Sequence, residues 1–118
     1  MMEERRRSPR VRAYRPVRLL HSPAPQVVET LTKDLAAGGV RCVSPTVFPI
    51  STELTVELAL STGDEPLTVR GQLVWFRTIP HSEQFDLGIA FRDMPQQHIR
   101  RLSGYLANIS RQTATVQV

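Results

Sequence analysis

The chain has 118 residues, of which 41% are hydrophobic and 22% are charged, as expected for one globular domain with a single core. No apolar run is long enough for a membrane-spanning helix, no apolar stretch follows the first residues as in a secretory signal, and the single cysteine, Cys42, excludes an internal disulfide or a cysteine cluster for zinc. We therefore expect a cytoplasmic protein that does not insert into a membrane.

The first segment of the chain is strongly basic. The formal net charge of the whole chain is +4, but residues 1–18 hold seven arginines against two glutamates and carry +5, which leaves −1 on the rest. Arginine presents a planar fork of donors that suits phosphate oxygens and the acceptor edge of guanine. We expect residues 1–12 to form a mobile arginine-rich arm that contacts an anion or a nucleotide. A solvated tail without a ligand is the alternative.

The body of the chain, residues 13–110, is predicted to be mostly strand. Large apolar side chains alternate with other residues in three segments, so each segment has one apolar face. The three segments are residues 53–60, 67–78 and 85–91, and shorter candidates are residues 17–20, 27–32 and 39–43. Turn residues separate these strands, and the number and spacing of the strands predict a small six-stranded antiparallel β-barrel or a sandwich. In segment 67–78 the alternation places Trp75 on the same face as Leu73, which favours its burial in the core.

One helix is predicted at the C-terminal end of this body. Asp93, Pro95 and Gln96 combine a capping acid, an early proline and a glutamine three residues after the acid. Apolar side chains then recur three and four residues apart, at Ile99, Leu102, Leu106 and Ile109, with Tyr105 beside them. The stripe predicts an amphipathic helix of about four turns that docks on the barrel. Residues 111–118 show no apolar face, and we expect them to form a loose tail.

Residues that could carry catalytic or metal chemistry are scattered along the sequence. His21, His81 and His98 fall in different segments, lack the spacing of metal ligands, and are expected on the surface or in loops. Cys42 follows Val40 in a strand pattern and is expected to be a small buried side chain. No glycine-rich phosphate loop is present. These observations favour a binding module without catalytic residues, metal or cofactor over an enzyme.

Two short motifs stand out in the first third of the chain. Arg6 and Arg10 form an R-x-x-x-R pattern, and Asp34, Ala36 and Gly39 form D-x-A-x-x-G. Together these motifs resemble those of the PilZ domain, the bacterial receptor module for cyclic di-GMP. The family pattern is R-x-x-x-R, then a first strand, then [D/N]-x-S-x-x-G where the second strand turns into the third. The later strands and the terminal helix predicted above also fit, so the resemblance covers roughly residues 3–110.

The resemblance implies cyclic di-GMP as the ligand and assigns roles to charged residues by position. Arg6 and Arg10 correspond to the main donors, to phosphate and to the O6/N7 edge of guanine. Arg5 corresponds to a further phosphate or stacking contact. Asp34 accepts from the N1 and N2 donors of guanine, which would give a preference for guanine over adenine.

The remaining positions implied by the resemblance are uncharged. Gly39 permits a close backbone approach or a backbone dihedral closed to other residues. Trp75 stands where some family members place an aromatic side chain against the ligand. Ala36 replaces the family serine, and the lost hydroxyl is worth about 0.5–1.5 kcal/mol, or roughly a three- to ten-fold weaker affinity.

The implied function is that of a receptor in second-messenger signalling. Cyclic di-GMP would order the arginine arm, and the ordered arm would signal to a separate, unidentified protein partner or through a homodimer. A PilZ-like protein–protein adaptor that has lost or weakened ligand binding is the alternative. Non-specific binding of nucleic acid is disfavoured, because the body is nearly neutral and offers few aromatic side chains for stacking.

Overall fold

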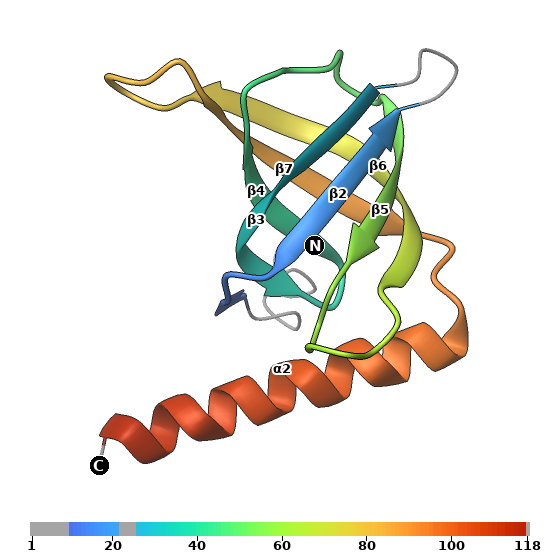
Figure 1. Ribbon diagram of the computed structural model, residues 1–118, viewed down its shortest axis with the longest axis vertical. Helices are drawn as coiled ribbons and strands as arrows, with labels where there is room; N and C mark the ends of the chain where they lie inside the picture. Colours follow the sequence, from blue (N-terminus) through green and yellow to red (C-terminus); the bar gives the residue numbers. More distant parts are fainter. Residues whose placement is uncertain (1–9, 22–25, 118) are drawn as a thin grey trace, which may run out of the picture.

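The computed structural model describes the backbone of residues 10–21 and 26–117, and the side chains of these residues up to 111. This part of the chain forms seven strands and one long helix (Figure 1). Their bounds are β1 Val11–Arg12, β2 Pro16–His21, β3 Gln26–Ala36, β4 Gly39–Ser44, β5 Glu53–Leu58, β6 Leu67–Thr78, β7 Phe85–Arg92 and α2 Gln96–Gln117.

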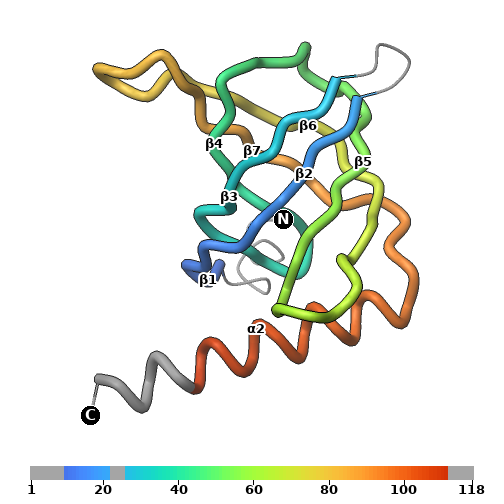
Figure 2. The backbone as a smooth tube through the Cα atoms, in the orientation of Figure 1, coloured from blue at the N-terminus to red at the C-terminus, as the bar shows by residue number. Residues whose placement is uncertain are grey.

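Strands β2 to β7 form a closed antiparallel barrel. The order of the sheet is β1-β3-β2-β5-β6-β7-β4, and an additional pairing of β3 with β4 closes the ring. The trace in Figure 2 follows this ring from β2 round to β4. The sequence-based prediction of a small six-stranded antiparallel barrel with one C-terminal helix is therefore confirmed.

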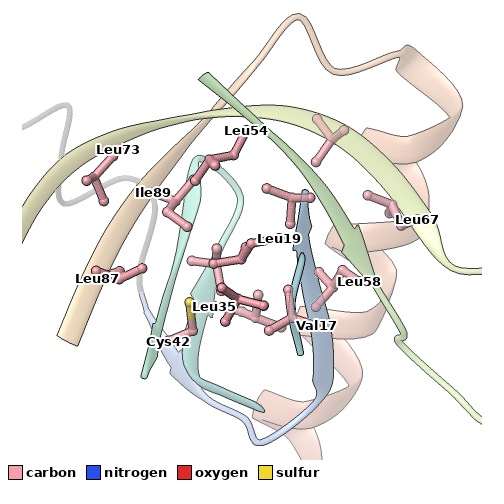
Figure 3. Packing of buried hydrophobic residues seen from close by; sticks show 14 of the residues in the cluster. Val17, Leu19, Leu35, Cys42, Leu54, Leu58, Leu67, Leu73, Leu87 and Ile89 are labelled. Atoms are coloured by element: carbon pink, nitrogen blue, oxygen red, sulfur yellow. The ribbon is translucent and has the colours of Figure 1, made fainter. Parts of the chain in front are cut away.

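The apolar side chains of the strands point into the barrel and pack there as one hydrophobic core (Figure 3). The largest side chains that are fully buried are leucines, namely Leu19, Leu35, Leu58, Leu67, Leu73, Leu87 and Leu102. Cys42 is also fully buried, as its strand pattern predicted, and burial raises the pKa of its thiol to about 12, with a smaller contribution from the charge of Asp86.

Helix α2 lies across one end of the barrel (Figure 1) and is longer than the sequence indicated. Leu102 inserts into the core, whereas Ile99, which we expected in the same buried stripe, is 38% exposed. The helix continues to Gln117, through residues expected to form a loose tail, because neither proline nor glycine follows Gly104 to end it. Within the described residues, no helix is both long and apolar enough to span a membrane.

Strand β1 holds the end of the basic segment against the barrel. Val11 lies opposite Leu35 and Arg12 opposite Asp34 at the edge of β3. The next residue, Ala13, donates its backbone N–H to the carbonyl of Lys33 at 3.1 Å. Residues 11 and 12, expected as part of a mobile arm, are therefore strand, because the end of β3 offers them backbone partners. Residues 1–9 of the expected arm lie outside the described residues.

Two β-bulges interrupt the alternation of the barrel and position the site described below. In β3 the register shifts between Thr32 and Asp34, so that Lys33 and Asp34 both face outward. In β6 it shifts between Leu73 and Trp75, and Trp75 then pairs with Gly88 on β7. A shift of one residue turns the following side chains to the other face. The expectation that Trp75 is buried in the core is therefore wrong.

Candidate ligand-binding site

A hollow of about 280 Å³ lies on the outer surface of the barrel where β3, β4, β7 and β6 run side by side. Glycine and alanine make up most of its wall, so the backbone is exposed to whatever occupies it. The lining residues are Arg10, Ala36, Gly38, Gly39, Val74, Trp75, Gly88, Ile89 and Ala90. Four of the residues that the sequence nominated, from three separate segments, therefore line one hollow.

Trp75 and Gly88 form one wall of the hollow together. A Cβ atom at Gly88 would lie 2.2 Å from both Cε2 and Nε1 of the indole, far inside contact distance. The absence of a side chain on β7 therefore lets the half-buried indole lie directly against the strand. The guanidinium of Arg77 lies 5.9 Å from the centre of the same ring, within range of a cation–π contact. Trp75 thus offers an aromatic surface to the hollow.

Gly39 and Ala36 form the turn at the other side of the hollow. They face each other across the β3–β4 pair. A Cβ atom at Gly39 would lie 2.4 Å from the carbonyl oxygen of Ile89, and Gly39 does not adopt a positive φ. Of the two reasons that the sequence left open for this glycine, close backbone approach therefore applies, and the approach is to β7. Ala36 is 5% exposed.

Asp34 lies beside the hollow and is held by two arginines. Arg10 donates from Nη1 to Oδ1 at 2.7 Å, and Arg41 donates from Nε to Oδ2 at 2.8 Å. The side chain of Asp34 is 13% exposed, whereas that of Arg10 is 53% exposed. One carboxylate oxygen is therefore bound by an exposed residue from before β1, and the other by a residue of the barrel wall.

Asp86 is a second carboxylate on the same outer face, and the sequence analysis did not nominate it. Lys33 lies 3.2 Å from its Oδ1, and Arg77 and Arg41 lie 3.3 and 3.9 Å from its Oδ2. Burial alone would raise the pKa of Asp86. The hydrogen bonds from Lys33 and Arg77, with the charges of Lys33 and Arg41, outweigh burial and hold this pKa below its ordinary value of 3.8. Only its outward position in the strand alternation pointed to it.

The structure thus brings together five of the nominated residues, Arg10, Asp34, Ala36, Gly39 and Trp75, around the hollow. Arg5 and Arg6, the other two, lie outside the described residues.

The histidines lie apart from this site. His21 packs edge-on against Phe48 with ring centres 5.2 Å apart, and His81 is exposed in the loop between β6 and β7. His98 lies near the start of α2 and is half-buried. No group of three or more metal-ligating side chains occurs among residues 10–21 and 26–111.

Comparison with known proteins points to one family. The PilZ domain model matches residues 4–108 of the chain. A search of curated proteins gave no match. Among solved structures, the PilZ domain with cyclic di-GMP of YcgR from Escherichia coli has a TM-score of 0.74 at 16% identity, and the alignment covers 96% of this chain and 97% of that one.

Two further solved structures share the fold. The PilZ domain of CeSA from a cellulose-synthesizing bacterium has a TM-score of 0.64 at 17% identity, over 87% of this chain and 99% of that one. The inhibitor of motility MotI/DgrA from Bacillus subtilis has a TM-score of 0.76 at 19% identity, with 93% of this chain covered. The chain spans about half the length of MotI/DgrA, 52%. Because the family model matches residues 4–108, most of the chain, the chain belongs to the PilZ domain family.

Proposed function

We propose that this chain is a receptor for cyclic di-GMP that binds the ligand in the hollow between Arg10 and Trp75. The observation that carries the proposal is the Arg10–Asp34 pair beside a hollow that is walled by an indole and by bare backbone. A guanidinium supplies donors for a phosphate, a carboxylate supplies acceptors for guanine, and an aromatic ring supplies a stacking surface. The similar solved structures of the YcgR PilZ domain and of MrkH are complexes with cyclic di-GMP, which supports the same ligand here.

Binding would exchange the partners of Arg10 and Asp34. Oδ1 of Asp34 accepts from Arg10, so guanine N1–H and N2–H must replace Arg10 at that atom. Arg10 is then free to donate to a ligand phosphate, which carries a full negative charge as the carboxylate does. Because Arg10 is about half exposed, the movement exposes little apolar surface. One ligand therefore gives Arg10 another anionic acceptor and gives Asp34 other N–H donors.

Arg5 and Arg6 would supply further donors to the phosphates of the ligand. A doubly anionic ligand would neutralise part of the charge of the segment before β1, and this segment would close over the hollow. The closed segment and the adjacent barrel face would form a surface for a separate protein or for a second copy of the chain. Hydrogen exchange tests this step, since amides of residues 3–9 should gain protection when cyclic di-GMP is added. Unchanged exchange of these amides at saturating ligand would contradict it.

Isothermal titration of the purified chain with cyclic di-GMP tests the receptor proposal, with GTP and cyclic di-AMP as controls. Saturable binding of cyclic di-GMP, with far weaker binding of cyclic di-AMP and GTP, is the expected result. Binding of every polyanion with a steep salt dependence would instead indicate a non-specific nucleic-acid contact.

A protein–protein adaptor is the second candidate function, and Ala36 favours it. This alanine lines the hollow where the family pattern has a serine hydroxyl. A folded protein that does not bind cyclic di-GMP in the titration would support the adaptor.

A further inference from the structure

We propose that Arg41 is a positioning residue that sets the preference for guanine by holding the carboxylate of Asp34, and that buried Asp86 anchors Arg41. The proposal rests on the receptor function above and deepens it. Neither Arg41 nor Asp86 belongs to the R-x-x-x-R or D-x-A-x-x-G pattern. Both lie on the outer face of the barrel beside the hollow.

Arg41 connects two carboxylates across three strands. It stands on β4, opposite Asp34 of β3 on one side and Gly88 of β7 on the other. Its Nε lies 2.8 Å from Oδ2 of Asp34, and its Nη1 lies 3.9 Å from Oδ2 of Asp86. The distance to Asp34 is that of a hydrogen bond, whereas the distance to Asp86 is that of a charge attraction without a hydrogen bond. Because the guanidinium is planar and rigid, the buried charge of Asp86 favours the orientation in which Nε of Arg41 meets Asp34.

The two carboxylates depend on Arg41 to different degrees. The side chain of Asp86 is 5% exposed and keeps Lys33 and Arg77 as partners if Arg41 is replaced. Asp34 would keep Arg10 alone among the residues that the structure describes. Replacement of Arg41 should therefore disturb Asp34 far more than Asp86.

The division of the two oxygens of Asp34 explains why this contact matters for recognition. Arg41 takes Oδ2, so Oδ1 is the atom that Arg10 and guanine share in turn. Without Arg41, the carboxylate is free to turn and to offer both oxygens to the fork of Arg10, the preferred geometry for this pair. The carboxylate would then no longer be held in the orientation that meets guanine N1–H and N2–H. Adenine lacks the N1–H and the 2-amino group, so binding of cyclic di-AMP does not use this acceptor.

The test measures the Kd of cyclic di-GMP and of cyclic di-AMP for Arg41→Gln, Arg41→Lys and Asp34→Ala. We expect Arg41→Gln to reduce the preference for cyclic di-GMP about ten-fold, the scale of one charge-assisted hydrogen bond. Arg41→Lys keeps the charge but not the fork, and should lose part of the preference. Circular dichroism checks that each variant is folded. If Arg41→Gln does not fold, the Kd values of Arg41→Lys provide the test instead.

Arg18→Gln is the matched control. Arg18 also lies between two carboxylates, 3.4 Å from Glu29 and 2.9 Å from Glu57, and none of these three residues lines the hollow. This substitution should leave both Kd values unchanged. A double-mutant cycle adds a second control, because Arg41→Gln should have no further effect on the preference once Asp34→Ala has removed the acceptor.

The possible outcomes separate this proposal from the receptor function. Loss of preference in Arg41→Gln that vanishes in the Asp34→Ala background supports the positioning role. Equal weakening of both nucleotides would show a general charge effect and overturn it. Unchanged Kd values would overturn it as well, with the receptor function intact. A wild-type chain that binds neither nucleotide would overturn both proposals.

Discussion

Two faces of this barrel each carry an arginine between two carboxylates, and they differ in what surrounds the arginine. On one face, Arg18 of β2 lies opposite both Glu29 and Glu57 in a regular antiparallel register. On the other face, Arg41 lies between Asp34 and Asp86 beside two β-bulges. The side chain of Glu29 is 72% exposed, whereas that of Asp86 is 5% exposed. The same charge pattern is therefore a solvated surface cluster in one place and a partly dehydrated cluster in the other.

The bulges account for this difference. A regular ladder places one outward side chain opposite another, and exposed ion pairs of this kind contribute about 0–1 kcal/mol. An extra residue in β3 turns both Lys33 and Asp34 outward, and an extra residue in β6 turns Trp75 outward onto Gly88. More side chains than usual therefore crowd the outer face and cover the carboxylates. A carboxylate that is shielded from water interacts more strongly with a ligand than a fully solvated carboxylate does. The shielded carboxylates of the bulged face are therefore better suited to recognise a ligand.

The largest expected effect separates the two faces by ligand affinity. Arg10→Ala should remove charge-assisted hydrogen bonds worth about 1.5–3 kcal/mol, a loss of roughly ten- to over a hundred-fold in affinity for cyclic di-GMP. Arg18→Ala, on the regular face, should leave the affinity unchanged. Isothermal titration measures both. An Arg10→Ala variant that titrates like the wild type would show that Arg10 does not contact the ligand.

The second effect separates the faces by stability. Asp86→Asn should lower the free energy of unfolding by about 1–3 kcal/mol at neutral pH, because Lys33, Arg41 and Arg77 lose a charged acceptor. Glu57→Gln on the regular face should change it by less than about 1 kcal/mol. Urea denaturation followed by tryptophan fluorescence measures both values. Similar losses in the two variants would contradict the contrast between the faces.

The pH dependence of Asp86→Asn has a definite sign. The pKa of Asp86 in the folded protein lies below its ordinary value of 3.8, since the hydrogen bonds and charges around it outweigh its burial. The folded state therefore favours the ionised form, and the stabilisation is complete above that ordinary value and is lost as the pH falls through the lower, folded pKa. The unfolding free energies of wild type and Asp86→Asn should thus converge in acid. A difference that persists below the folded pKa would argue against the ion pairs as its cause.

The third effect tests the indole wall of the hollow. Gly88→Ala places a Cβ atom where Trp75 now lies, so the ring must move away from β7, at a cost of about 1–3 kcal/mol for overpacking. We expect weaker binding of cyclic di-GMP and a shifted tryptophan emission. Gly104→Ala is the control, because nothing lies within 4 Å of that position on α2, and alanine there favours the helix. Equal affinities in the two variants would exclude a role for the indole.

The regular parts of this molecule follow from its sequence, and the bulged parts do not. Alternation predicted the barrel strands and the buried Cys42, because period-2 patterns report the face of each residue directly. The same rule misplaced Trp75, since the extra residue Val74 leaves no mark in a pattern of apolar residues. For Asp86 it gave the outward position but not the burial, which depends on side chains from three other strands. The sequence motifs located residues that line the hollow, whereas Arg41 and Asp86 became evident only from the folded structure.

The smallest expected effect concerns Ala36, where the sequence departs from the family pattern. Ala36→Ser adds a hydroxyl to a residue that lines the hollow and is 5% exposed. If the hydroxyl meets the ligand, affinity for cyclic di-GMP should rise by about 0.5–1.5 kcal/mol, or roughly three- to ten-fold, at an unchanged melting temperature. If it meets only the packed turn, a buried hydroxyl without a partner should cost about 1–3 kcal/mol of stability.

Titration and thermal unfolding of the Ala36→Ser variant distinguish the receptor from the adaptor. Tighter binding with the same melting temperature means that this outer face is a competent site with one donor removed. A lower melting temperature with no gain in affinity means that the turn between β3 and β4 is packed for another purpose. Because Ala36 faces Gly39, whose backbone lies against β7, there is little room for the turn to relax around an unpaired hydroxyl. The two results therefore should not occur together, and the second would favour the protein–protein adaptor.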